Sequence, residues 1–438
     1  MTFLFFVLLV LTCSAMVAWG LQQRGRVYEY PFLAGVVFGG WVLPQAVGLL
    51  RDEALPSGGL AKTLLMTVLC AAMLSLGYAW RRREWRVLAW EFDKGRLLQG
   101  AVVLSIIGAY FTYLIRNLPE DMLTGVWTGL PVRYLFFAHL QIYGFAIAAL
   151  LFARTGSRIA LAIAVFDLAF FLDPILVAAR RAFAVEVALI ILLAFWFGRG
   201  WALPRGAMVA LVVLGLLLTF SIGHYRALTY RGGLYGGRTG RFPTWEDVKS
   251  IDYGENLSAI LTRGGPELRN AVYDIAATQE LSSFNFGLSY WNRLMFTYVP
   301  AQLFGEELKA SVMFHEDDAA WKVYAYTARF GSTHTGMADS FQALWYVGAM
   351  MFFAIAWIMR SLYDMSRDGQ VVAQLAYVLI ITDAVRAITH DTSGFFMPWV
   401  HMSVFILPVI FWARIRYPEA HLAPGTNQKS TRCFTGLL

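Results

Sequence analysis

Charged residues are scarce in this chain. Asp, Glu, Lys and Arg make up 15% of its 438 residues, whereas soluble domains carry about a quarter. Hydrophobic residues make up 58%, and they gather in blocks of roughly 20 residues, the length that crosses the hydrocarbon core of a bilayer. This composition excludes an ordinary soluble enzyme and predicts a protein that crosses a membrane many times.

Cysteines and the motifs of nucleotide-dependent enzymes are also rare or missing. The three cysteines, Cys13, Cys70 and Cys433, have no spacing typical of a metal site or a disulfide framework. The chain has no Walker A sequence, no GxGxxG after a strand and no HExxH. We therefore expect no metal and no cofactor, and we expect the energy to come from an ion gradient or an activated substrate.

Acidic residues are fewer than basic ones, so the net charge is +7. The basic residues stand in short loops between apolar blocks, which is typical of membrane topology and not of a groove for a nucleic-acid duplex. We therefore expect no nucleic-acid partner.

The apolar blocks predict an all-α fold, a polytopic bundle of about eleven transmembrane helices. Lipid offers no partner for an unpaired backbone group, so each block is expected to be a helix. Arg24 and Arg26 follow the first block, and no basic residue precedes it, so we expect a retained helix and not a cleaved signal peptide. The blocks are 1–21, 30–50, 60–80, 99–115, 132–153, 158–178, 182–198, 206–223, 340–360, 371–390 and 395–413.

Basic residues in the loops predict the orientation. The segment after the third block is the most basic, so we expect it on the cytoplasmic side of a bacterial inner membrane. Alternation then places the N-terminus outside, and it divides the chain into helices one to eight (1–223), a large periplasmic segment (224–339), helices nine to eleven (340–413) and a cytoplasmic tail (414–438). The basic residues that set this orientation are Arg81, Arg82, Arg83, Arg86, Lys94 and Arg96.

The segment 224–339 has parts of different character. Tyr230 to Trp245 is rich in Gly and Arg, which predicts a mobile basic loop. An apolar stripe at steps of four and three predicts an amphipathic helix on the membrane or over the bundle; it consists of Phe284, Leu288, Trp291, Met295 and Tyr298. The acids of the segment are expected to form mostly a solvated surface, although any one of them is able to act as a general base. They are Asp252, Glu255, Glu267, Asp274, Glu306, Glu307, Glu316, Asp317 and Asp318.

Arg180 and Arg181 stand at the junction of the sixth and seventh helices, on the predicted external side. Positive charge there runs against the topological bias. Guanidinium groups bind phosphate oxygens in bidentate fashion, so the pair is a candidate anion clamp. The alternative is snorkelling to lipid phosphates or an ion pair with Asp173.

A second candidate group lies on the tenth helix. Asp383, Arg386 and His390 are three and four residues apart, which places them on one helical face, and Asp391 follows. Ionisable residues in membrane helices are costly and mark functional sites by default. This face either lines a polar cavity that is open to the outside, or it carries an Asp–Arg ion pair that faces the interior of the bundle.

Two residues of the external segment complete the candidates. Arg293 lies off the apolar stripe of the amphipathic helix, and His334 lies in Gly331-Ser-Thr-His-Thr-Gly336, just before the ninth helix. A neutral imidazole accepts a proton near pH 7, so His334 is a candidate general base; otherwise it is a solvated loop residue. His139 and His401, inside the fifth and eleventh helices, are expected to pack between helices.

Three short stretches in the external segment and at the start of the ninth helix, together with the earlier Arg180–Arg181 pair, resemble a known group. They are Tyr290-Trp-Asn-Arg293 to Pro300-Ala-Gln-Leu-Phe304, the His334 run followed by Asp339-Ser340, and Leu344-Trp-Tyr-Val-Gly348. The chain resembles the O-antigen polymerases of the Wzy type and other oligosaccharide repeat-unit polymerases, with the O-antigen ligases as relatives. It departs from the ligases at Thr335-Gly336, where an Asn commonly follows the His.

This resemblance implies a C-type membrane glycosyltransferase that polymerises undecaprenyl-diphosphate-linked oligosaccharides into an O-antigen or exopolysaccharide, without nucleotide sugar or metal. It also implies membrane lipid, a chain-length regulator and a flippase as partners. The alternatives are a ligase, a lipid-linked oligosaccharide flippase or other transporter, and a non-catalytic scaffold. The assigned roles are catalysis for His334 and Arg293, diphosphate binding for Arg180, Arg181 and Arg386, and cavity lining for Asp383, His390 and Asp391.

Overall fold

The computed structural model describes residues 1–80, 85, 90–119, 122, 129–229, 242–299, 305–316, 318–329 and 331–415. Within these ranges the chain is all-α, and β-type pairing is confined to a single bridge between Phe92 and Arg414. The arginines at 81–83 and 86, most of the predicted basic loop (230–241) and the tail from 416 onward lie outside the described residues.

Among the described residues, ten helical segments are long and apolar enough to cross a membrane, or eleven if one bent pair counts as a span. This confirms the multi-pass membrane architecture that the apolar blocks predict. The spans are α1 (Thr2–Gln22), α2–α3 (Tyr30–Leu49), α4 (Gly59–Ala79), α5 (Lys94–Arg116), α6–α7 (Leu130–Thr155), α8 with its terminal turn (Arg158–Val177), α9 (Arg181–Arg199), α19–α20 (Gly336–Arg367), α21 (Val371–Thr389) and α22 (Ser393–Ala413).

Three of these spans consist of two helices joined at an irregular turn. The π-helical turn Phe38–Val42 separates the first pair, and the 3₁₀ turn Trp345–Ala349 separates the last. The paired helices are α2 (Tyr30–Val37) and α3 (Leu43–Leu49), α6 (Leu130–Ala138) and α7 (Leu140–Thr155), and α19 (Gly336–Leu344) and α20 (Met350–Arg367).

Two spans begin earlier than the apolar blocks predict, because polar caps start them. Asp93 accepts a hydrogen bond from the backbone N–H of Arg96 at 2.8 Å, which starts α5 at Lys94. The hydroxyl of Thr335 likewise caps α19, where it accepts from the backbone N–H of Ala338 at 3.3 Å. Such caps satisfy backbone donors that a hydropathy window does not detect.

The predicted eighth helix is bent. The structure divides it into α10 (Arg205–Phe220) and α11 (Ile222–Thr229), which meet at 64°. The break falls at Ser221, whose hydroxyl accepts a hydrogen bond from the side-chain amide of Asn256 at 3.1 Å. The Thr229 hydroxyl donates to the carbonyl of Val177 at 3.1 Å, so α11 is held against the end of α8.

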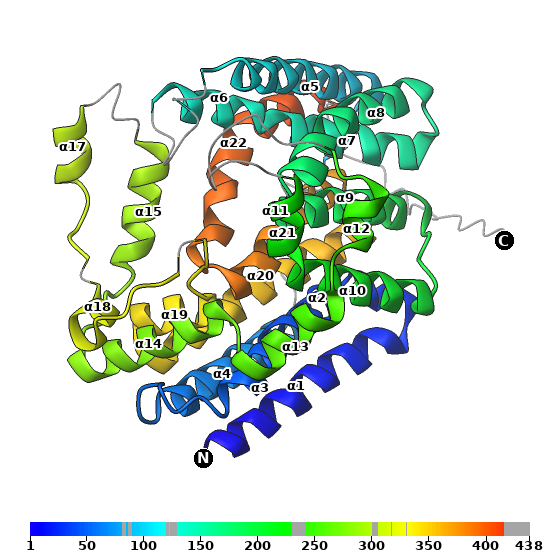
Figure 1. Ribbon diagram of the computed structural model, residues 1–438. Helices are drawn as coiled ribbons and strands as arrows, with labels where there is room; N and C mark the ends of the chain where they lie inside the picture. Colours follow the sequence, from blue (N-terminus) through cyan, green and yellow to red (C-terminus); the bar gives the residue numbers. More distant parts are fainter. Residues whose placement is uncertain are drawn as a thin grey trace, which may run out of the picture.

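The span α21 lies at the centre of the bundle (Figure 1), where it contacts α2, α7, α9, α20 and α22. Its side chains from Val372 to Thr382 are buried. At the periphery α1, α8 and α10 expose apolar side chains, among them Phe3, Val165 and Leu214. These faces suit contact with lipid tails, which are as apolar as leucine.

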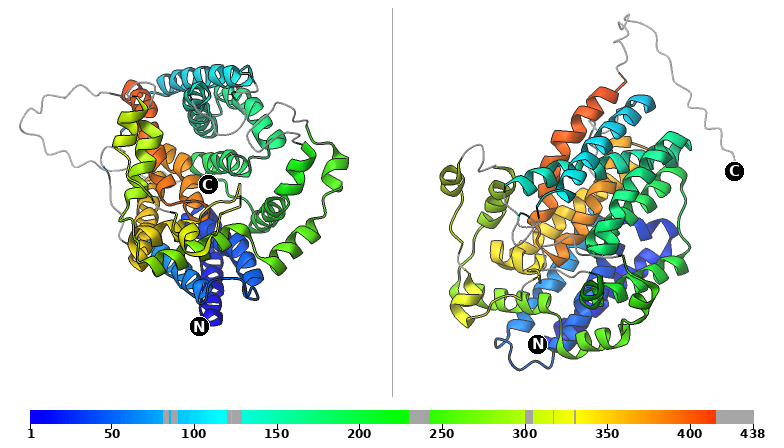
Figure 2. Two further views of the ribbon diagram at one scale, coloured as in Figure 1. Left: turned by 60° about the vertical axis from the view of Figure 1, so that its left-hand side comes forward. Right: turned by 45° about the horizontal axis from the view of Figure 1, so that its top comes forward.

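The described part of the segment between α11 and α19 holds six further helices: α12 (Trp245–Lys249), α13 (Tyr253–Arg263), α14 (Pro266–Leu281), α15 (Leu288–Tyr298), α17 (Glu306–Ser311) and α18 (Ala319–Tyr324). The predicted amphipathic helix corresponds to α15, which begins at Leu288, so Phe284 of the predicted stripe lies before the helix. In all views α15 and α17 stand at the edge of the molecule (Figures 1 and 2). The helix α13 packs on α3 and α10, and α14 packs on α4, α18 and α19.

Candidate functional site

The candidate site is built around the turn between α21 and α22. Arg386 Nη1 lies 3.1 Å from Asp383 Oδ1, so the predicted polar face of α21 carries an ion pair. One turn further on, His390 Nδ1 lies 2.8 Å from the hydroxyl of Thr389. Arg386 remains 45% exposed on its side chain, so a ligand is able to reach it.

Helix α15 brings Arg293 to this turn. Tyr290 and Thr392 share a hydrogen bond between their hydroxyls at 2.7 Å, and the Tyr298 hydroxyl donates to the carbonyl of Met397. Arg293 lies one turn after Tyr290, on the side of the helix that faces the bundle, and its Nη1 lies 3.1 Å from Asp391 Oδ2. Docking of α15 along α22 therefore fixes a guanidinium group that is itself 50% exposed.

The start of α9 supplies a third guanidinium group. Arg181 Nη2 lies 3.9 Å from Glu267 Oε1 of α14, and its Nη1 donates to the carbonyl of Thr219 at 3.5 Å. Arg180 immediately before it is exposed. Asp173 pairs with Arg116 at 3.8 Å, which differs from the predicted alternative of a pair with the Arg180–Arg181 dipeptide.

The three guanidinium groups act together on His390. Burial and the positive charges of Arg386, Arg181 and Arg293 lower the pKa of this imidazole to about 4, and only Asp391 opposes them among the charges that contribute most. His390 is therefore neutral at pH 7. Arg181, Arg293 and Arg386 all remain partly exposed, so an anionic group is able to reach guanidinium nitrogens at this end of the bundle.

His334 lies next to this cluster and belongs to a carboxylate–imidazole pair. Its Nδ1 is 2.7 Å from Asp274 Oδ2, and Asp274 is buried whereas 59% of the His334 side chain is exposed. The hydrogen bond to Asp274 raises the pKa of the imidazole, against the opposing effect of burial. An Nδ1–H that donates to the carboxylate leaves Nε2 as a free ring nitrogen that is able to accept a proton.

Asp339 connects the imidazole pair to the arginine cluster. Its Oδ2 accepts hydrogen bonds from the backbone N–H of Thr392 at 2.8 Å and from the Thr392 hydroxyl at 2.5 Å. Its charge acts on His334, and it is itself acted on by Arg293 and Asp391. The groups assigned to catalysis and to the diphosphate, Arg180 excepted, are thus linked through contacts or charges at one end of the bundle.

Close packing of α19 on α21 holds the His334 loop in place. A Cβ added to Gly336 would lie 1.7 Å from the carbonyl oxygen of Ala387. Nearby, the Thr333 hydroxyl donates to the carbonyl of Thr389 at 2.7 Å, and Asn270 of α14 donates to the carbonyl of Thr333 at 3.1 Å. The run from Ser332 to Gly336 therefore contacts both α14 and α21.

One of the external acids departs from the expected solvated surface. Asp274 belongs to the buried face of α14, where it lies among Ala271, Ile275 and Thr278, and not to a solvated surface. The signal was present in the sequence, because positions 271, 274, 275 and 278 share one helical face. A carboxylate on an otherwise buried face indicates a specific partner, which here is His334.

Sequence reasoning also missed an acid inside a span. Asp167 lies midway along α8, in the sixth apolar block at 158–178. It is fully buried and accepts a hydrogen bond from the Ser105 hydroxyl at 2.7 Å. Its Oδ1 and the nearby Gln141 Nε2 have no hydrogen-bond partner among the described residues. Its position in an apolar block was sufficient to mark it as a candidate.

The two intramembrane histidines pack between helices as expected. His401 is buried, with Nδ1 2.8 Å from the Tyr143 hydroxyl and Nε2 2.9 Å from the carbonyl oxygen of Phe136. The His139 ring centroid lies 5.3 Å from that of His401. Within the described ranges no group of three or more His, Cys, Asp or Glu side chains is arranged to hold a metal ion.

Comparison with known proteins gives no family. No family model, no curated protein and no solved structure matches this chain. The chemistry of the site is therefore derived from the residues themselves.

The two histidines of the site are expected to differ in their reactivity toward diethyl pyrocarbonate, which modifies the neutral imidazole. Because the pKa of His334 lies above its ordinary value of 6.5, its modification rate should rise with pH and reach half its maximum above pH 6.5. Replacing Asp274 with Asn should shift that midpoint to lower pH. Mass spectrometry of the modified peptides between pH 5 and 8 measures the rates.

His390 is the internal control for this titration. With a pKa of about 4 it should react at an unchanged rate across the same range. Asp252→Asn is the matched variant, since Asp252 caps α13 through the backbone N–H of Glu255 at 2.8 Å and does not contact His334. A His334 midpoint that stays in place in Asp274→Asn would show that the carboxylate does not control the imidazole.

Proposed function

We propose that the chain is a membrane glycosyltransferase that joins polyprenyl-diphosphate-linked oligosaccharide repeat units into a surface polysaccharide. The observation that carries this proposal is the set of three arginines around His390, with the free Nε2 of His334 beside it. Arg181, Arg293 and Arg386 come from three separate helices, and all three remain partly exposed. The exposed exocyclic nitrogens suit a diphosphate, whose oxygens accept forked hydrogen bonds.

The proposed reaction needs one base and one anion-binding site. A hydroxyl of the acceptor sugar attacks the anomeric carbon of the donor, and its proton passes to Nε2 of His334. The bond between the anomeric carbon and the diphosphate oxygen breaks, and polyprenyl diphosphate leaves with the electron pair. Fixed guanidinium groups stabilise the negative charge that develops on the leaving oxygen. The diphosphate linkage is already activated, so no nucleotide is consumed.

The paired carboxylates have a positioning role in this proposal. Asp391 and Asp383 hold Arg293 and Arg386 at 3.1 Å each, which fixes the guanidinium planes before substrate arrives. Fixed charges stabilise a transition state better than mobile ones, because they need little reorganisation during the reaction. Asp274 in the same way orients the His334 ring.

The proposed location follows from the charge bias of the loops. We place the site at the periplasmic face of a bacterial inner membrane, with the C-terminus in the cytoplasm. Lys94, Arg154 and Arg199 then lie on the cytoplasmic side, at the ends of α5, α7 and α9 opposite to the site. Repeat units delivered to the outer leaflet by a flippase reach the site directly.

A transporter of lipid-linked oligosaccharides is the second candidate. The buried Asp167 favours it, because a carboxyl group near the middle of a span is typical of proton and substrate pathways. Its neighbours Ser105 and Gln141, however, belong to α5 and α7 and not to the arginine cluster. The three arginines at one end of the bundle fit an enzyme better.

The decisive experiment supplies purified protein with lipid-linked repeat units in detergent, without nucleotide sugar or metal. We expect the glycan chains to lengthen, as seen by electrophoresis or mass spectrometry of the lipid-linked products. Movement of the same lipid across liposomes without any elongation would instead support the transporter. Transfer of a preformed glycan to a lipid A core acceptor, without elongation, would support a ligase.

A further inference from the structure

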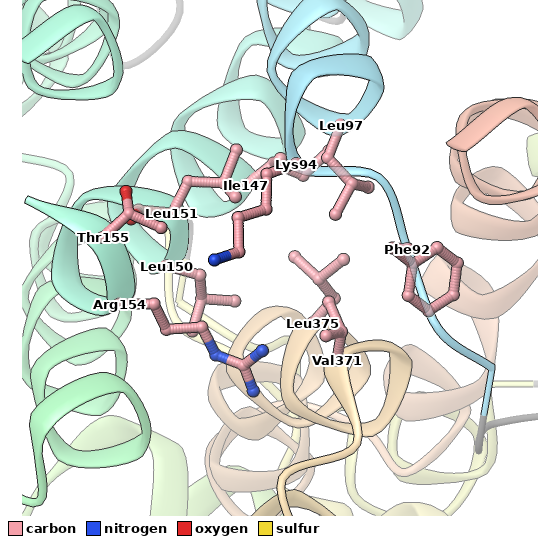
Figure 3. A pocket seen from close by; sticks show the side chains of 10 residues that line it. All are labelled: Phe92, Lys94, Leu97, Ile147, Leu150, Leu151, Arg154, Thr155, Val371 and Leu375. Atoms are coloured by element: carbon pink, nitrogen blue, oxygen red, sulfur yellow. The ribbon is translucent and has the colours of Figure 1, made fainter. Parts of the chain in front are cut away.

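A cavity of about 70 Å³ lies at the end of the bundle opposite to the candidate site. Ten residues line it, and they come from the start of α5 and the residues before it, the last turns of α7 and the first turns of α21 (Figure 3). The helix α21 has 19 residues, roughly 28 Å at 1.5 Å per residue. The cavity and the arginine cluster are therefore separated by about the thickness of a bilayer core.

Two cations face this cavity. Figure 3 shows that the amino group of Lys94 and the guanidinium group of Arg154 point toward the space between the helices. Arg154 is held in place, because it donates to Gln374 Oε1 at 2.6 Å and to the carbonyl of Gly369 at 3.0 Å. No acidic residue occurs among the described residues that line the space. Two like charges on one cavity repel, and an anion between them removes that repulsion.

The rest of the lining is apolar apart from Thr155. Leu97, Ile147 and Leu375 are buried side chains that form its walls. Inorganic phosphate would gain nothing from such walls. A phospholipid satisfies both parts of the cavity, because its phosphate meets the cations and the start of its acyl region meets the leucines.

The surroundings place the cavity at headgroup depth. Arg414 lies 4.1 Å from the ring centroid of Trp90, and Arg96 lies 5.4 Å from that of Trp412. Tryptophan and arginine together are typical of the membrane–water interface. Basic pockets between spans at this depth bind the headgroups of anionic lipids.

We propose that Lys94 and Arg154 form a binding site for an anionic phospholipid, wedged between the ends of α5, α7 and α21. The lipid bridges the ends of three spans, and so it stabilises the end of α21 remote from the candidate site. The proposal is independent of the reaction assigned to that site.

The experiment measures binding of phosphatidylglycerol to the purified full-length chain by native mass spectrometry, together with the thermal midpoint in detergent. Wild-type protein should retain phosphatidylglycerol and gain stability from it, while phosphatidylcholine and inorganic phosphate give smaller shifts. Lys94→Gln should bind phosphatidylglycerol about fivefold more weakly, the effect of roughly 1 kcal/mol per cation near the membrane surface. Lys94 is exposed, so this variant should fold.

Two variants complete the test. Lys94→Arg keeps the charge and should keep the lipid. Arg158→Gln removes an exposed charge at the same end of the bundle that does not line the cavity, and it should bind like the wild type. If Lys94→Gln and Arg158→Gln weaken phosphatidylglycerol binding equally, the effect comes from general surface charge and the proposed site is wrong. An equal shift with inorganic phosphate alone would overturn the lipid as its occupant.

Discussion

Replacing Arg293 with alanine should lower the rate of glycan elongation about a hundredfold or more, while the protein remains folded and inserted. Loss of one preorganised contact to a developing anion costs on the order of 3 kcal/mol. The Arg293 side chain is 50% exposed, and its partner is Asp391 at 3.1 Å. The substitution therefore changes the charge of the site and does not disturb the packing of the core. Rates of elongation by purified variants measure the effect, and size-exclusion chromatography checks the fold.

The lysine variant and a matched control separate geometry from charge. Arg293→Lys should recover only part of the rate, because a point charge loses the bidentate geometry of guanidinium. Arg269→Ala is the control, since Arg269 also pairs with a carboxylate, Asp52 at 2.6 Å, and is not among the charges that dominate at His390. If Arg293→Ala elongates glycan at the wild-type rate, Arg293 has no role in the proposed reaction. If Arg269→Ala loses as much elongation rate as Arg293→Ala, the loss is a general effect of charge.

Replacing Gly336 with alanine should destabilise the protein by about 3 kcal/mol, at the upper end of the range for overpacked sites. The new Cβ would lie 1.7 Å from the carbonyl oxygen of Ala387. Both groups are attached to backbone, so no rotamer change relieves the clash, and α19 must move away from α21. Because His334 lies two residues before Gly336, elongation should fall together with the thermal midpoint.

Gly215→Ala is the matched control for this substitution. A Cβ at Gly215 in α10 meets no atom within 4 Å, so the change should be neutral or stabilising, by up to about 1 kcal/mol from helix propensity. Thermal unfolding in the same detergent compares the two variants. Equal midpoints for Gly336→Ala and the wild type would mean that the α19–α21 contact yields easily and does not fix the His334 loop.

The local chemistry of the chain was enough to predict its spans and one face of the site. Hydrophobicity over about 20 residues is a local property, so the ten spans of the described residues follow from it. The main differences are the bend at Ser221, the capped starts at Lys94 and Gly336, and the later end of α20 at Arg367. The pairing of Asp383 with Arg386 follows from helical spacing alone. The same reasoning predicted α15 from its apolar stripe.

The partners of the remaining site residues were decided by tertiary structure. Arg293 meets Asp391 because α15 docks along α22, and His334 meets Asp274 across 60 residues of sequence because α14 packs on α19. The periodicity of a single sequence shows which face of a helix is apolar, but it does not show which other helix packs against that face. The pairing of helices depends on close backbone contacts, such as the one between Gly336 of α19 and Ala387 of α21. The sequence by itself therefore determined the membrane spans and the candidate charges, and only the packing of distant helices decided which of those charges share one site.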